Sequence, residues 1–100
     1  MSLLDVQVIL SPQAEDDFAD ILQYTIETWG EAQAYVYRAL IDKALLTIQR
    51  HPQIGHSRPE ISVEHLIFPA GQHLIIYRAS DAAVYVSRIL HERMDIGRHL

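Results

Sequence analysis

Several residue types and patterns are missing from this sequence, and each absence excludes a class of site or of protein. The 100 residues contain no cysteine, which excludes disulfide bonds, cysteine-ligated zinc and thiol nucleophiles. No run of about 18 apolar residues occurs, and no basic segment followed by an apolar one opens the chain. We therefore expect no membrane span and no secretory signal, and the composition suits a reducing cytoplasm.

Glycine and basic residues are also scarce. The four glycines form neither GxGxxG nor GxxxxGK[ST], and the sequence has no GxSxG. The net charge is −5, and residues 1–50 hold eight acidic against three basic side chains. Proteins that bind nucleic acid through its phosphates usually carry a dense basic surface. We therefore expect no direct nucleic-acid binding by this chain alone.

Six histidines raise the question of a metal site. They are His51, His56, His65, His73, His91 and His99. They include no i, i+4 helical pair, no His-x-His strand pair and no HExxH signature. We expect neither a metal ion nor another cofactor.

The residues that are present are typical of one globular domain. The apolar fraction is 49% and the charged fraction 21%, which is ordinary for a folded protein. A chain of this length holds one hydrophobic core. Residues 1–100 are therefore predicted to form a single domain.

Two helices are predicted in the first half. Ser11 is suited to cap the first helix and Pro12 to occupy its first position, and apolar residues then recur at helical spacing as far as Gly30. A second helix is predicted over residues 31–51. The turn between the helices is so short that they must lie antiparallel, as a hairpin.

The second half changes to the alternation that is typical of strands. Strands are predicted at residues 64–68, 72–79 and 83–91, with a loop at residues 52–60. Hairpin-length connections make these strands antiparallel. With a first strand at residues 6–10, the order is β-α-α-β-β-β. The predicted fold class is α+β, with a helical hairpin packed on a small antiparallel sheet.

Both faces of this sheet are predicted to be apolar, although one helical hairpin covers only one of them. In the last strand, alternation places Val84, Val86 and Leu90 on one face and Tyr85 and Ile89 on the other. Either the first strand and the loop after the second helix cover the second face, or a partner chain does.

Two further expectations concern the helical hairpin. Asp16, Asp17 and Asp20 fall on its outer face, where they are predicted to be solvated helix charges rather than paired catalytic carboxylates. Trp29 and Tyr37 lie near its turn and are predicted to be partly buried.

Basic side chains in and near the strands are the candidates for binding a target, because arginine is suited to bidentate recognition of carboxylates and phosphates. The candidates are Arg58, Arg78, Arg88, His91 and Arg93. His91 is the best acid–base candidate, because it ends the last strand among arginines. The alternative for the strand arginines is pairing inside the domain with Asp81, Glu64 or Asp95.

A series of motifs runs through the chain in a fixed order. The two most specific are Trp29-Gly30-x-x-Gln33-Ala34 and Arg88-x-Leu90-His91-x-x-Met94-Asp95. The others are Leu10-Ser11-Pro12-x-Ala14-x-x-Asp17, Tyr24-Thr25, Tyr37, His51-Pro52-x-Ile54-Gly55, Arg58-Pro59-Glu60, Phe68-Pro69 and His73-Leu74-Ile75-Ile76-Tyr77-Arg78. Over nearly its whole length, the chain thus resembles the ParE-type toxins of the RelE/ParE toxin–antitoxin superfamily.

The resemblance implies a bacterial, cytoplasmic toxin of a plasmid-stabilisation type, which a ParD-like antitoxin neutralises. It also implies DNA gyrase as the target and no enzymatic activity, because the ParE branch inhibits gyrase. The RelE branch shares the fold but cleaves messenger RNA on the ribosome, so a RelE-like endoribonuclease is the alternative. A low-potency toxin retained as an antitoxin-binding module is another. The acidic net charge favours gyrase over the polyanionic ribosome.

The same resemblance offers a cover for the second apolar face of the sheet. The family's antitoxin lays an extended and helical segment across its toxin. The residues expected to bind the antitoxin are Leu66, Phe68, Ile75, Tyr77, Tyr85 and Ile89.

Overall fold

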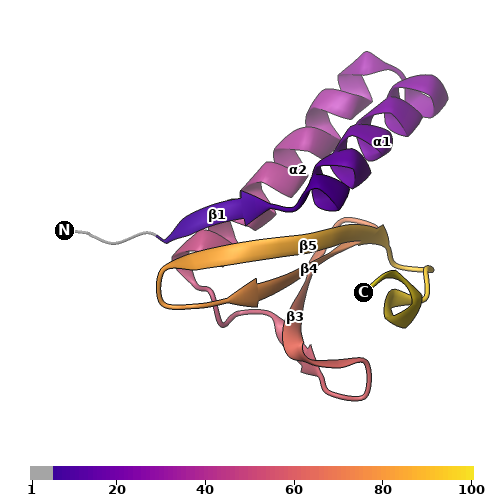
Figure 1. Cartoon of the computed structure of the whole chain (residues 1–100). Helices are drawn as coiled ribbons and strands as arrows, with labels where there is room; N and C mark the ends of the chain where they lie inside the picture. The colour runs from indigo at the N-terminus through magenta and orange to yellow at the C-terminus, as the bar shows by residue number, and fades with distance from the viewer. Residues whose placement is uncertain (1–5) are drawn as a thin grey trace.

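The computed structural model describes residues 6–100 and shows a helical hairpin packed on one face of a five-stranded sheet (Figure 1). The first elements are β1 (Gln7–Leu10), α1 (Pro12–Trp29) and α2 (Glu31–Arg50). They are followed by β2 (His56–Arg58), β3 (Ser62–Ala70), β4 (His73–Ala79), β5 (Ala83–His91) and the short 3-10 helix η1 (Ile96–His99). The predicted α+β class is confirmed. In the described part of the chain, no helix is long and apolar enough to cross a membrane.

The helices begin and end where the sequence predicts. Ser11 caps α1, because its hydroxyl accepts a hydrogen bond from the Ala14 N–H at 3.0 Å. Gly30 alone separates the two helices, with a φ of 93°. This backbone conformation is almost closed to residues with a side chain, so the hairpin depends on a glycine at this position.

The sheet has the strand order β1-β5-β4-β3-β2, with β1 parallel to β5 and the other pairs antiparallel. The predicted loop at residues 52–60 is wrong in part, because it contains β2. The third strand also runs past its predicted end at residue 68. There β2 pairs with β3 only as far as Ile67, so Pro69 lies at an open edge, where a strand tolerates a missing N–H.

The main core lies between the helices and the sheet. Ile41 and Ile48 of α2 pack there against the sheet, and both are fully buried. Ile75, Tyr77 and Ile89 face the same core and are at most 2% exposed. The expectation that these three side chains bind an antitoxin is therefore wrong, because the helices of the same chain already cover them.

A smaller apolar cluster occupies the second face of the sheet, as predicted. It contains Ile67, Ile76 and Leu90, and its cover is Ile96 of η1 together with Ile61. The C-terminal 3-10 helix η1 thus covers the second face of the sheet. The sequence had suggested the first strand and the loop after α2, or a partner chain, as the cover.

A β-bulge explains why Leu90 lies in this second cluster. Tyr77 pairs with Val86 while Ile76 pairs with Arg88, so Ser87 is an extra residue in β5. The bulge reverses the alternation beyond it. Ile89, and not Leu90 as predicted, therefore shares the helix-covered face with Val84 and Val86.

Candidate functional site

A groove of about 850 Å³ opens between the helical hairpin, the β3–β4 turn and the end of β5. Its lining includes Tyr24, Trp29 and Tyr37 from the helices and His73, His91 and Met94 from the sheet side. We refer to this hollow as the hairpin groove. Tyr24 is 64% exposed, Trp29 71% and Met94 47%. An aromatic surface of this kind is typical of a binding site.

The two predictions for the hairpin aromatics have different outcomes. Tyr37 is partly buried, as expected. Trp29 is largely exposed, because it is the last residue of α1 and lies at the tip of the hairpin, away from the core.

Tyr37 organises the floor of the groove. Its hydroxyl accepts a hydrogen bond from the Gln72 N–H at 3.0 Å and is 2.5 Å from Nδ1 of His73. The rings of Tyr37 and His73 meet edge to face at 5.4 Å, and those of His73 and His91 at 5.2 Å. Gly71 completes the turn at a φ of 62°, and a Cβ there would lie 2.8 Å from the Tyr37 oxygen. The β3–β4 turn is thus built around the Tyr37 hydroxyl.

Burial favours the uncharged forms of Tyr37 and His73 in this cluster. Burial lowers the pKa of His73, and the neighbouring His91 lowers it further, while Glu92 and Asp17 act in the opposite direction. Burial likewise raises the pKa of Tyr37. At neutral pH the uncharged form of His73 and the protonated form of Tyr37 are therefore favoured. The tyrosine oxygen and Nδ1 of His73 share one hydrogen bond, and the hydroxyl also lies 3.4 Å from the Ala70 carbonyl as a second acceptor.

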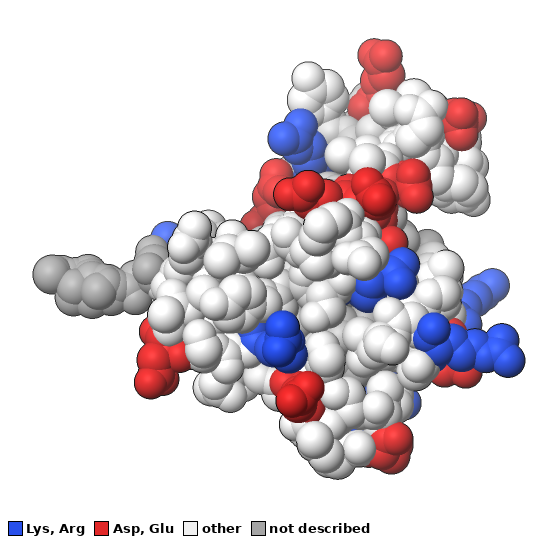
Figure 2. Space-filling view, in the orientation of Figure 1, with Lys and Arg blue, Asp and Glu red and all other residues white. Residues whose placement is uncertain are grey.

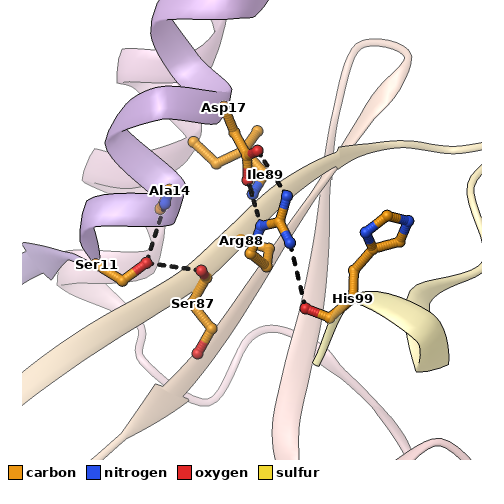
Figure 3. A network of polar contacts seen from close by, with 7 residues as sticks. All are labelled: Ser11, Ala14, Asp17, Ser87, Arg88, Ile89 and His99. Carbon is orange, nitrogen blue, oxygen red and sulfur yellow. Dashed lines mark hydrogen bonds and ion pairs between the residues drawn. The ribbon is translucent and has the colours of Figure 1, made fainter.

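A second polar cluster joins the start of α1 to β5 (Figure 3). Arg88 donates to the Asp17 carboxylate from Nε at 2.7 Å and from Nη2 at 2.8 Å. The same carboxylate accepts the Ile89 N–H at 3.0 Å, and Nη1 of Arg88 donates to the His99 carbonyl at 3.3 Å. These contacts tie α1, β5 and η1 together.

This pairing corrects two expectations. Arg88 does pair within the domain, but with Asp17 rather than with Asp81, Glu64 or Asp95. Asp17 is not a solvated helix charge, because its side chain is only 15% exposed. The hydrogen bonds that Arg88 donates to the Asp17 carboxylate raise the pKa of Arg88, so the guanidinium stays charged and held in place.

The predicted target-binding residues do not form one site. His91 and Arg93 lie together, and the Arg93 N–H donates to Nδ1 of His91 at 3.1 Å. Arg78 lies near the other end of β4, over the ring of Tyr85 at 5.8 Å. Arg58 is in β2, 3.5 Å from Glu60. The structure thus separates Arg58 and Arg78 from the end of β5.

The remaining predicted antitoxin-binding residues are unequally accessible. Leu66 and Phe68 are partly buried and pack against the main core. Tyr85 is 40% exposed, on the sheet face that the helices do not cover. Of the six residues, Tyr85 alone offers a substantial part of its side chain to a partner.

Neither the hairpin groove nor the role of Asp17 was predicted from the sequence. Trp29 and Tyr37 stand in recognised motifs, but their convergence with His73 depends on how the hairpin packs on the sheet. Asp17 did carry a signal, because it follows the buried Ala14 by three residues and so shares its helix face.

Charge is unevenly distributed over the surface. Figure 2 shows acidic side chains gathered where the helical layer meets the sheet, and basic side chains in separate small groups over the same view. The side of the molecule in view therefore has no continuous basic surface of the kind that binds a phosphate backbone.

Comparisons with known proteins give a consistent result. Residues 8–96 match the family described as "ParE toxin of type II toxin-antitoxin system, parDE". The chain is 33% identical over 93 residues to Toxin ParE1 of Mycobacterium tuberculosis (strain ATCC 25618 / H37Rv), covering 92% of this chain and 95% of that protein. It is 30% identical over 91 residues to Toxin ParE1 of Caulobacter vibrioides, covering 91% and 94%.

A solved structure has the same fold. It is described as "Chromosomal ParDE TA system from P. aeruginosa", and the superposition has a TM-score of 0.75 over 87% of this chain and 96% of that chain. The sequence identity is 15%, so this likeness concerns the fold alone.

Proposed function

Because the chain belongs to the ParE toxin family of ParDE type II toxin–antitoxin systems, we propose that a ParD-like antitoxin neutralises it and that it inhibits DNA gyrase by contact, without catalysis. The ion pair of Arg88 is the observation that carries the contact mechanism. Cleavage of RNA needs cationic groups that are free to stabilise the charge of the reacting phosphate. The guanidinium of Arg88 is held by Asp17 instead, so Arg88 does not join Arg93 as a second free cation at the end of β5.

The hairpin groove is the proposed antitoxin site. This proposal is supported by the exposure of Tyr24, Trp29 and Met94, because large apolar side chains are then in contact with water in the isolated chain. The apolar face of an antitoxin segment would remove this surface from water. This location replaces the sheet residues that the sequence suggested, most of which are covered by the helices.

The proposed gyrase contact is the rim formed by His91 and Arg93. Arg93 is exposed, and the ion pairs found within residues 6–100 do not include it. Arg88 supports this rim from beneath by holding the end of β5 against α1. Arg58 and Arg78 lie too far along the sheet to share the contact.

A gyrase supercoiling assay with ATP tests the proposal. The wild-type toxin should block supercoiling and trap cleaved DNA, and added antitoxin should restore supercoiling. Arg93→Ala should lose inhibition at an unchanged melting temperature. Arg58→Ala is the matched control, because it removes an exposed arginine elsewhere and should inhibit as the wild type does.

Two results would contradict the proposal. Codon-specific cuts in messenger RNA on translating ribosomes, with gyrase unaffected, would favour the RelE-like endoribonuclease. Tight antitoxin binding by a wild-type chain that affects neither gyrase nor messenger RNA would identify a low-potency antitoxin-binding module.

A further inference from the structure

One wall of the hairpin groove carries an unpaired negative charge. Asp20 lines the groove on the same helix face as Tyr24 and precedes it by one turn of α1. Its side chain is exposed, and Asp20 forms no ion pair with any of residues 6–100. The residues lining the groove include no lysine or arginine.

The surroundings add to this negative charge. Glu92 is next to the groove, because its backbone N–H donates to the carbonyl of the lining residue Gln72 at 2.9 Å. The acidic side chains in Figure 2 gather along the same junction of the helical layer and the sheet. The groove therefore combines exposed aromatic rings with a lining in which the Asp20 carboxylate is the one acidic side chain and no lysine or arginine opposes it.

We propose that the groove selects an antitoxin segment carrying an arginine or lysine beside a large apolar side chain, with the cation bound by the Asp20 carboxylate against the ring of Tyr24. Aromatic faces attract cations, and a guanidinium both stacks on a ring and pairs with a carboxylate. The apolar neighbour packs toward Trp29. An acidic segment is rejected, because it would place like charges together in a partly desolvated groove. This inference rests on the proposed binding of the antitoxin in the groove.

The test measures the affinity of the toxin for the ParD-like antitoxin encoded beside it, by calorimetry. Asp20→Asn should weaken binding about tenfold and Asp20→Lys about a hundredfold, as expected for the loss and then the reversal of a close charge pair. Asp81→Asn and Asp81→Lys are the matched controls, because Asp81 is exposed in the β4–β5 turn, and they should change affinity by less than about twofold. Melting temperatures show that each variant folds.

Charge reversal on the antitoxin identifies the partner residue. Each of its lysines and arginines is replaced in turn by glutamate, and one replacement should restore binding to Asp20→Lys while weakening binding to the wild type. Added salt should weaken the wild-type complex more than the Asp20→Asn complex.

The outcomes separate this inference from the function on which it rests. If the Asp20 variants bind as tightly as the wild type while Trp29→Ala binds weakly, the groove is occupied without a cation, and the inference alone is overturned. If substitutions at Asp20 and at Trp29 both leave the affinity for the antitoxin unchanged, the antitoxin binds outside the groove, and both the groove assignment and this inference are wrong. If the wild type binds no ParD-like antitoxin, the proposed function itself is wrong.

Discussion

Arg88 and Asp17 act as a structural tie between two elements that meet only in the folded chain. The side chains are 22% and 15% exposed, and the carboxylate also accepts a backbone N–H of β5. Removing one member of such a pair leaves the other partly buried without its counter-charge. A substitution at Arg88 therefore affects folding before it affects any contact with a target.

We expect Arg88→Ala to lower the free energy of unfolding by about 1–3 kcal/mol, a range reduced from that of fully buried pairs because the site is partly solvated. Urea unfolding measures this change. Arg98→Ala is the control, because its pair with Asp95 is largely exposed, and it should change stability by less than about 0.5 kcal/mol. Equal stability of the two variants would return Arg88 to the candidate target contacts.

Two partly buried histidines make stability depend on pH. The pKa of His73 is lowered by burial, and burial likewise lowers the pKa of His65. The unfolded chain therefore binds these protons at a higher pH than the folded chain, so the stability present above about pH 6.5 is lost as the pH falls toward the folded-state pKa values. Urea unfolding at about pH 7.5 and pH 5 should show this loss.

The loss should be smaller in His73→Asn and in His65→Asn than in the wild type, because each variant removes one of the two groups. A slope unchanged in His73→Asn would mean that His73 binds its proton equally well in the folded and unfolded states.

At the scale of elements, local signals in the sequence account for what could be predicted. Ser11, Pro12 and Gly30 mark the helix ends through backbone geometry alone, and the alternation of residues 83–91 defines β5. The Ser87 bulge could not be predicted, because it arises from how β5 pairs with β4. β2 and η1 also escaped prediction, since each is too short to show a period.

The candidate site was less predictable than the fold, for the same reason. Asp17 and Arg88 are 71 residues apart in the sequence, and no spacing rule connects them. The groove brings together two helices, a turn and a strand end. A motif can mark Trp29 or Tyr37 as important without indicating which surface it builds.

The connection between α1 and α2 gives a prediction at this scale. Gly30→Ala should destabilise the protein by about 1–3 kcal/mol, the cost of holding a side-chain-bearing residue in this backbone region. A Cβ at this position meets no atom within 4 Å, so the whole effect comes from the backbone.

Gly97→Ala is the control, because a Cβ there makes only an ordinary contact at 3.5 Å and the backbone is unstrained. Thermal or urea unfolding compares the two variants. A Gly30→Ala protein as stable as the wild type would show that the hairpin accepts another turn geometry.

At the scale of the whole molecule, the groove and the proposed gyrase rim share a residue. His91 lines the groove and also stands next to Arg93 at the end of β5. A segment bound in the groove therefore covers part of the surface assigned to the target. Under the proposed function, neutralisation would then follow from direct occlusion and would need no change in the shape of the toxin.

The single tryptophan reports on this arrangement directly. Trp29 is the only tryptophan in the chain and is 71% exposed, so the free toxin should emit at the wavelength of a solvated indole. An antitoxin in which any tryptophan is replaced by phenylalanine should shift this emission to shorter wavelengths, because the groove loses water when it is filled. The Trp29→Phe toxin is the control, because it has no tryptophan and should show no such emission. A complex that forms by size exclusion with no shift would place the antitoxin on another surface, and the exposed aromatic wall would then need a different occupant.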